Sequence, residues 1–148
     1  MGERMTIGEL ASRTGVATSA LRYWEELGLL PPPARVSGQR RYPPSAVGQV
    51  GVVLALRNVG FTLQEVKTFI GSRSAPGDGW RELYRRKLTE LDRRITQAQV
   101  ARIAVAHGLA CPNEDIFACP TFARGVEAIL AGRSLDEAHE QAHTVSRP

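Results

Sequence analysis

Cysteine is scarce in this chain, and long apolar runs are missing from its sequence. Two cysteines, Cys111 and Cys119, among 148 residues exclude a small secreted protein held together by disulfides. No apolar run approaches the roughly 18 residues of a membrane-spanning helix, and the N-terminus lacks the apolar segment of a secretory signal peptide. The length fits one ordinary domain. We therefore expect a soluble protein of the reducing cytoplasm.

Lysine is also scarce, and the basic residues are unevenly distributed. Only Lys67 and Lys87 are lysines among the 19 basic residues. Residues 1–74 and 75–107 carry net charges of +4 and +3, whereas residues 108–148 carry −3. A basic N-terminal part permits a polyanionic partner such as a nucleic acid, and arginine suits bidentate contacts to phosphate and guanine. Arginine enrichment alone is equally compatible with a GC-rich genome.

The N-terminal third predicts two short helices with defined ends. Thr6 and Glu9 have the spacing of a capping box, and the helix that they begin should be broken by Gly15. A second helix is predicted from about Thr18 to Gly28. Two short helices joined by a glycine-containing turn are typical of a helix-turn-helix.

Residues 31–44 contain five prolines and are predicted to form a β-hairpin or wing with its turn at Ser37-Gly38. A helix is predicted over residues 45–59, ended by Gly60, and another over residues 63–70 behind a second capping box. The first of these two helices should bury Val47, Val50, Leu56 and either Val53 or Leu54.

A loop rich in Gly, Ser and Pro, residues 71–79, is the clearest boundary in the chain. Residues 80–107 contain neither Gly nor Pro, and this predicts one long helix that Gly108 ends. A lone helix would leave its apolar residues in water. Their near-heptad spacing therefore predicts a coiled coil with a second copy of the chain. The near-heptad seam consists of Tyr84, Leu88, Leu91, Ile95, Ala98 and Val105.

Three segments resemble the MerR family of transcription regulators in sequence, order and spacing. They are TIGELASRTGVATSALRYWEELGLL (6–30), SGQRRY (37–42) and LRNVGFTLQEV (56–66). The resemblance covers residues 5 to about 107. It implies a homodimer that binds an inverted repeat in double-stranded promoter DNA and distorts it so that RNA polymerase can engage.

The resemblance also implies a mainly α fold in three parts. Residues 1–74 would form a winged helix-turn-helix DNA-binding domain, and residues 75–107 a long antiparallel coiled-coil dimerisation helix. Residues 108–148 would form a small helical effector-sensing region. In that region a helix is predicted from Phe122 to Leu130 and a last one over residues 135–143, capped by Ser134 with Glu137.

Hydroxyl, guanidinium and phenol groups on the second helix and the wing fit DNA. The second helix would enter the major groove and the wing would reach the adjacent backbone. Because Tyr23 and Trp24 are neighbours on one helix, we expect Trp24 in the core and Tyr23 toward phosphate. Together with positions carried over by resemblance, the predicted DNA-binding set is Thr18, Ser19, Arg22, Tyr23, Arg40, Tyr42 and Arg57.

The segment CPNEDIFACP, with Cys111 and Cys119, is similar to the metal-binding loop of copper- and zinc-sensing family members. Two thiolates suit a soft cation such as Cu(I), whereas Zn(II) needs further ligands, for which His107 and Asp115 are candidates. Zinc and mercury sensors carry a cysteine at the start of the long helix, and copper sensors a serine. Residues 77–79 of this chain are Gly-Asp-Gly, so it has neither a cysteine nor a serine there.

Other roles for the two cysteines stay open. They could form a reversible disulfide, or be structural in a regulator that responds to a small organic molecule. A helix bearing Phe122 and Ile129 favours the structural role, because it could pack the loop onto the partner's DNA-binding domain.

Two other classes of protein are alternatives to a regulator. An enzyme built on Cys111 and His107 would lack an oxyanion site, so we expect no enzyme. A non-regulatory DNA architectural protein is the remaining alternative. His139 and His143 have a spacing that suits a metal, but exposed tail histidines are more typical of solvated polar residues.

Overall fold

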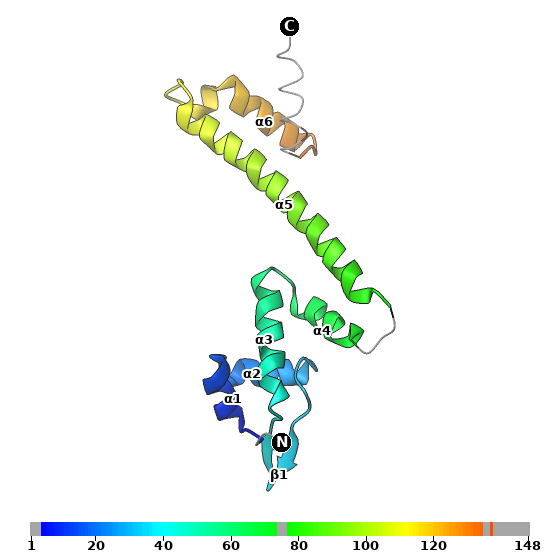
Figure 1. The fold of residues 1–148 in the computed structure, drawn as a ribbon. Coiled ribbons are helices and arrows are strands. Elements are labelled where there is room, and N and C mark those ends of the chain that lie inside the picture. The colour runs from blue at the N-terminus through cyan, green and yellow to red at the C-terminus, as the bar shows by residue number, and fades with distance from the viewer. Residues whose placement is uncertain (1–3, 74–76, 135–136, 138–148) are drawn as a thin grey trace. The chain divides into compact units, whose positions relative to one another are not determined.

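The computed structural model describes residues 4–73, 77–134 and 137, and the prediction of a mainly helical chain is confirmed (Figure 1). The chain divides into two compact units, residues 1–85 and 86–148, which are described separately. Among the described residues, no helix is both long and apolar enough to cross a membrane. The helices are α1 (Ile7–Thr14), α2 (Thr18–Glu26), α3 (Ser45–Asn58), α4 (Leu63–Ser72), α5 (Gly79–Ala110), the short 3-10 helix η1 (Ile116–Ala118) and α6 (Pro120–Leu130).

Helix α1 begins and ends where the sequence predicts. The Thr6 Oγ1 accepts a hydrogen bond from the Glu9 N–H at 3.2 Å, and the Glu9 carboxylate accepts one from the Thr6 N–H at 2.6 Å. Gly15 follows the helix with φ +70°, a left-handed conformation that favours glycine. The same capping box, with Thr62 and Glu65, begins α4.

The predicted wing is a two-stranded antiparallel hairpin, β1 (Ala34–Val36) with β2 (Gln39–Arg41). Its turn residues, Ser37 and Gly38, both have positive φ, at 49° and 76°, as a tight two-residue hairpin turn requires. The backbone of Tyr42, just past β2, exchanges two hydrogen bonds with Met5, at 2.8 and 2.9 Å. The wing is thereby joined to the start of the chain.

Two apolar clusters form the core of the unit that spans residues 1–85. Trp24 packs against both of them, as predicted, and Tyr23 is 52% exposed. In α3 the buried residue of the predicted pair is Val53, whereas Leu54 is exposed. The buried residues of the first cluster are Met5, Leu10, Leu21, Leu30, Tyr42, Ala46 and Val50, and those of the second are Leu29, Val53, Leu56, Phe61, Val66 and Leu83.

The long helix α5 runs through Gly108 to Ala110, so the prediction that Gly108 ends it is wrong. A glycine inside a helix costs about 1 kcal/mol, which a helix of this length tolerates. The helix ends instead before Cys111-Pro112, because proline lacks an N–H and disfavours the helical conformation of the residue before it. This end point decides where the cysteine loop starts.

Most of the predicted seam of α5 is in solvent in the single chain. Leu88, Ile95 and Val105 are 61%, 55% and 66% exposed. Tyr84 differs, because its ring lies 5.3 Å from that of Phe61, centroid to centroid, within the N-terminal unit. The first seam position therefore contributes to packing inside its own chain.

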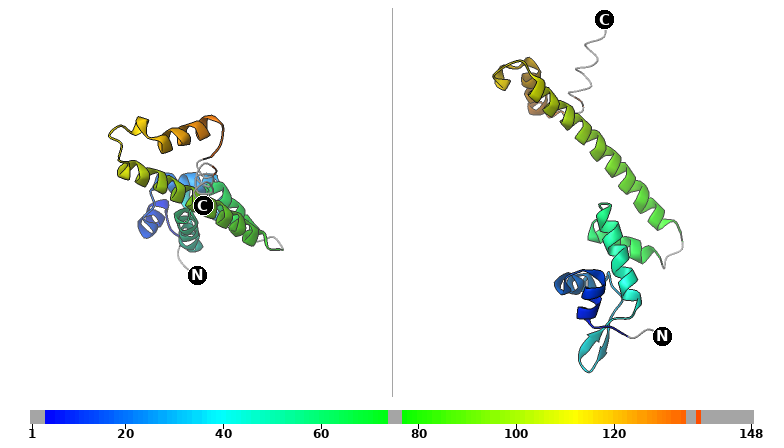
Figure 2. Two further views of the ribbon diagram at one scale, coloured as in Figure 1. Left: turned by 90° about the horizontal axis from the view of Figure 1, so that it is seen from above. Right: turned by 60° about the vertical axis from the view of Figure 1, so that its left-hand side comes forward.

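After α5 the chain reverses direction, so that α6 runs back along the C-terminal part of α5 (Figure 2). The predicted helix from Phe122 to Leu130 is present and starts two residues earlier, at Pro120. Ser134 and Glu137 exchange the hydrogen bonds of the predicted capping box, at 3.0 and 3.3 Å. The rest of the predicted last helix, with His139 and His143, lies outside the described residues.

Candidate metal centre and nucleic-acid interface

One face of α2 is free for an interaction with a partner. Ser19, Arg22 and Tyr23 are exposed, and Thr18 is half-buried. Residues 19, 22 and 23 are three and four positions apart, so they share one face of the helix, while Leu21 is buried in the first cluster. The structure thus presents a hydroxyl, a guanidinium and a phenol side by side.

Glu25 of α2 holds the end of the wing. Its carboxylate accepts a hydrogen bond from Arg40 Nε at 3.1 Å and a second from the hydroxyl of Tyr42. Tyr42 is completely buried, and burial, with the hydrogen bond to Glu25, raises the pKa of its phenol to about 12. The prediction that Tyr42 reaches DNA is corrected: its ring belongs to the core, and its hydroxyl is used by Glu25.

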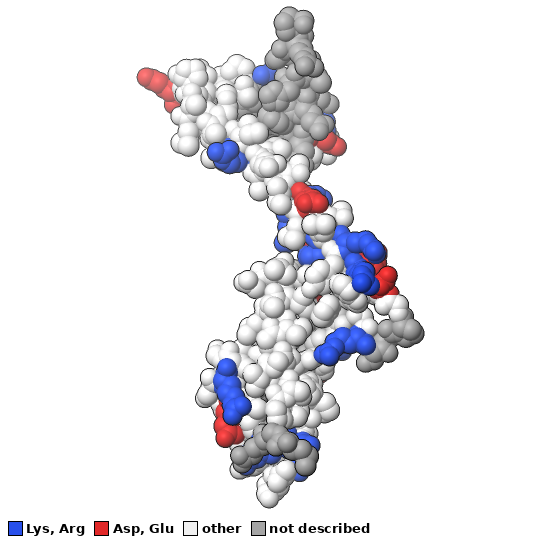
Figure 3. All heavy atoms as spheres, in the orientation of Figure 1, with Lys and Arg blue, Asp and Glu red and all other residues white. Residues whose placement is uncertain are grey.

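Arg57 and Arg40 keep exposed side chains, but each already has an intramolecular partner. Arg57 Nη1 donates a hydrogen bond to the backbone oxygen of Phe61 at 3.0 Å and so supports the turn after α3. Figure 3 shows that basic side chains on one face of the molecule are scattered, several of them beside acidic ones. On that face they do not form one continuous patch.

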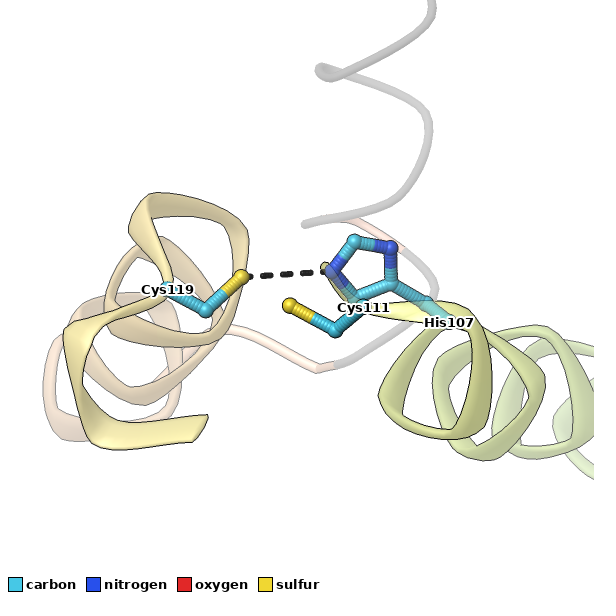
Figure 4. Close-up of side chains that lie close together, drawn as sticks. All are labelled: His107, Cys111 and Cys119. Atoms are coloured by element: carbon cyan, nitrogen blue, oxygen red, sulfur yellow. Dashed lines mark hydrogen bonds between the residues drawn. The ribbon is translucent and has the colours of Figure 1, made fainter. Parts of the chain in front are cut away.

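His107, Cys111 and Cys119 form a compact group of metal-ligating side chains in the unit that spans residues 86–148. Their ligand atoms all lie within 4.8 Å of one another. The His107 Nε2 is 3.3 Å from the Cys119 Sγ, and Figure 4 shows the imidazole and both sulfur atoms converging. Cys119 is only 3% exposed, whereas Cys111 and His107 are half-buried. Both cysteines are free thiols.

The end of α5 positions two members of this group. His107 lies in the last turn of the helix, and Cys111 follows Ala110 directly. Four positions separate them, so they lie on the same side of the helix. This relationship exists because α5 continues past Gly108 to Ala110, beyond the end that the sequence predicts.

The short helix η1 returns Cys119 to the same place. The Asp115 carboxylate accepts a hydrogen bond from the Phe117 N–H at 2.9 Å and so begins η1. The Cys119 N–H donates to the Ile116 oxygen at 3.1 Å, and Pro120 starts α6 at a position where its missing N–H costs nothing. Of the two further zinc ligands that the sequence suggests, His107 lies beside Cys119, and Asp115 caps η1.

The surroundings of Cys119 favour its thiolate. The hydrogen bond with His107, and next the backbone N–H of Phe122 in the first turn of α6, lower the pKa of this thiol from 9.0 to about 6. Cys111 has a weaker polar neighbour, Asn113, whose Nδ2 donates to the sulfur at 3.4 Å. The imidazole is paired with Cys119, and not with Cys111 as the enzyme alternative required.

A helix-turn-helix followed by a wing and a long helix is typical of DNA-binding regulatory proteins. Comparison with known families supports this class for the chain. Residues 5–72 match the family described as "MerR HTH family regulatory protein", and residues 47–107 match "MerR, DNA binding". The chain belongs to the MerR family of transcription regulators.

Curated relatives cover most of this chain. It is 32% identical over 123 residues to the "Mercuric resistance operon regulatory protein" of Bacillus cereus. The aligned segment covers 79% of this chain and 93% of the relative. It is 31% identical to the "HTH-type transcriptional regulator CueR" of Salmonella typhi, and this alignment covers 78% of this chain and 88% of the relative. These relatives are transcription regulators and not enzymes.

Solved structures share the fold. The lead(II) complex of the transcription regulator PbrR691 from Ralstonia metallidurans CH34 matches with a TM-score of 0.63 and 23% identity, covering 78% of this chain and 94% of that one. HiNmlR, a MerR family regulator bound to promoter DNA, matches with a TM-score of 0.51 and 20% identity, covering 88% and 96%.

Proposed function

We propose that this MerR-family protein is a homodimeric transcription regulator whose activity depends on a metal ion bound by Cys111 and Cys119. The observation that carries the proposal is the convergence of these two sulfurs and the His107 imidazole within 4.8 Å. Thiolate donors suit a soft or borderline cation such as Cu(I) or Zn(II). A relative named for mercuric resistance and a fold neighbour complexed with lead(II) support the same chemistry.

The two cysteine side chains can reach one ion without rearranging an element of secondary structure, because their sulfur atoms lie within 4.8 Å of each other. A bound cation would supply positive charge that holds the end of α5 to the start of α6, where Cys119 precedes Pro120. The free energy of binding is then available to shift the dimer between two arrangements that differ by a few kcal/mol. The residues 108–148 are the effector-sensing region in this proposal.

The DNA interface consists of α2 and the wing, within the domain of residues 1–74. Thr18, Ser19, Arg22 and Tyr23 face the major groove, and most contacts are to phosphates, which position the protein. Arg40, held by Glu25, and Arg57, held at the end of α3, contribute charge near the backbone. Tyr42 has no part in this interface.

The exposed seam of α5 supports the homodimer, with residues 75–107 as an antiparallel coiled coil. Leu88 and Ile95 leave apolar side chains in water on a helix that is otherwise strongly charged, and burial in a second copy would remove this cost. The dimer binds an inverted repeat in double-stranded promoter DNA in the cytoplasm. It activates by distorting the DNA between the two half-sites for RNA polymerase.

A redox switch at the same cysteines is the second candidate. The two free sulfurs are within 4.8 Å of each other, and a thiol with a lowered pKa reacts readily in disulfide exchange.

Purification without oxygen separates the two candidates. For a metal sensor we expect about one ion per chain and metal-dependent transcription from a promoter that carries the operator. For a redox switch we expect two free thiols to be lost on mild oxidation, with no metal bound. If the protein neither binds metal nor loses thiols on oxidation, and cysteine variants still respond normally, both candidates are contradicted.

A further inference from the structure

We propose that His107 is a third ligand of the metal centre, which makes it a Cys2His site that prefers a divalent cation such as Zn(II) over Cu(I). The inference rests on the proposed metal-dependent function, and it adds a ligand and a preference between ions. It starts from the side chains that converge in Figure 4.

The geometry is close to that of a tetrahedral site. Zinc binds sulfur at about 2.3 Å and histidine nitrogen at about 2.0–2.1 Å, so two ligands of one tetrahedral ion lie roughly 3.5–3.8 Å apart. The His107 Nε2 and the Cys119 Sγ are 3.3 Å apart, and the whole group lies within 4.8 Å. Side-chain movements on the order of 1 Å bring all three donors to one zinc ion.

Charge favours a divalent ion. Two thiolates carry two negative charges, and a neutral imidazole adds none, so a divalent cation gives a centre with no net charge. A monovalent ion would leave one negative charge beside Cys119, which is 3% exposed. Burying an uncompensated charge is costly.

The number of donors points the same way. Two thiolates alone complete the linear coordination that suits Cu(I), and the histidine is then superfluous. Zinc takes four ligands, and a set of two cysteines and one histidine leaves one position for water or another small ligand. His107 is therefore the residue that distinguishes the two ions.

The test uses the full chain and four variants, one of which, Cys111→Ser, removes a thiolate. His107→Gln removes the proposed ligand, and His107→Cys supplies another one at the same position. Asn113→Ala is the matched control, because it removes a hydrogen bond to the Cys111 sulfur without removing a ligand. Competition with chromophoric chelators gives the affinities for Zn(II) and Cu(I). Co(II) substituted for zinc reports the coordination number through the intensity of its d–d bands.

We expect His107→Gln to weaken Zn(II) binding at least about tenfold, because loss of even an outer-shell partner costs about 10–100-fold. Its Co(II) spectrum should change, and its Cu(I) affinity should remain close to that of the wild type. His107→Cys should restore tight Zn(II) binding, and Asn113→Ala should alter neither affinity substantially. Far-ultraviolet circular dichroism checks that each variant keeps its helices.

The other outcomes separate this inference from the proposed function. If His107→Gln keeps the Zn(II) affinity and the Co(II) spectrum while Cys111→Ser loses both, His107 is not a ligand, and the metal sensor stands. Equal weakening of Zn(II) and Cu(I) would overturn the preference for a divalent ion. If the wild type binds neither Zn(II), Co(II) nor Cu(I), the proposed metal-dependent function fails together with this inference.

Discussion

The hydroxyl of Tyr42 donates a hydrogen bond to the carboxylate of Glu25, which fixes the end of the wing to α2. Arg40 donates to the other carboxylate oxygen of Glu25 at 3.1 Å. One acidic side chain thus positions a core residue and a basic residue of the wing. The spacing between α2 and the wing therefore depends on Glu25.

Removal of the Tyr42 hydroxyl should destabilise the DNA-binding domain. Tyr42→Phe keeps the buried ring but loses a hydrogen bond to a charged group, which contributes about 1.5–3 kcal/mol to the free energy of unfolding. Urea denaturation followed by circular dichroism measures the loss. Tyr23→Phe is the control, because its hydroxyl is at the surface and the change should stay within about 0.5 kcal/mol. Equal effects would contradict the structural role of Tyr42.

DNA binding should be steeply salt-dependent, with a footprint that is two-fold symmetric. Arg22→Ala should cost about 1–3 kcal/mol and relax base preference at one position of each half-site. Arg40→Ala should weaken binding to all sequences alike and flatten the dependence of affinity on salt. Arg93→Ala removes an exposed cation of α5 and should change little. Fluorescence anisotropy at several salt concentrations measures these effects, and salt-independent binding would refute the interface.

An acidic residue in the seam of α5 should break the dimer. Ile95→Asp places a charge from each subunit in an apolar interface, where an uncompensated charge costs roughly 3–5 kcal/mol. Since Ile95 is 55% exposed in the single chain, the fold of the subunit should survive. Sedimentation should show a monomer that has lost operator binding. Gln97→Asp, an exposed position two residues away, should remain dimeric, and a dimeric Ile95→Asp variant would place the seam elsewhere.

The two cysteines should act as one unit in the response. Cys111→Ser and Cys119→Ser should each abolish induced transcription as fully as the double variant, since either loss destroys a shared ion or a shared disulfide. Operator affinity of the metal-free protein should stay within about tenfold of the wild type, or about 1.4 kcal/mol. Additive partial losses in transcription would show that the cysteines work independently.

The Cys119 thiol should titrate near pH 6 in the metal-free protein. Its pKa is lower in the folded chain than the ordinary 9.0, so the thiolate stabilises the fold fully above about pH 9, and this contribution is lost as the pH falls through about 6. Thiolate absorbance of the Cys111→Ser variant, where Cys119 is the one remaining thiol, measures the midpoint. His107→Gln should raise the midpoint, because the imidazole is the largest cause of the shift. An unchanged midpoint would show that another group lowers this pKa.

The local sequence determined where most elements begin and end. Thr6 with Glu9 starts α1, and Ser37-Gly38 makes the turn of the wing, because a cap or a tight turn depends on residues within four positions of one another. The same local logic placed Trp24 inward and Tyr23 outward. The resemblance of CPNEDIFACP to the metal-binding loop of family members also predicted a candidate metal site.

Tertiary structure decided which side chains face one another and which are buried. Tyr42 follows a wing strand and looked available to DNA, but it completes the core against α1, α2 and α3, and only packing could decide that. His107 and Cys119 are 12 residues apart, and their pairing depends on how far α5 extends and how η1 turns the chain back. Such contacts depend on which surfaces of separate elements meet, and the pattern within one segment carries no record of that.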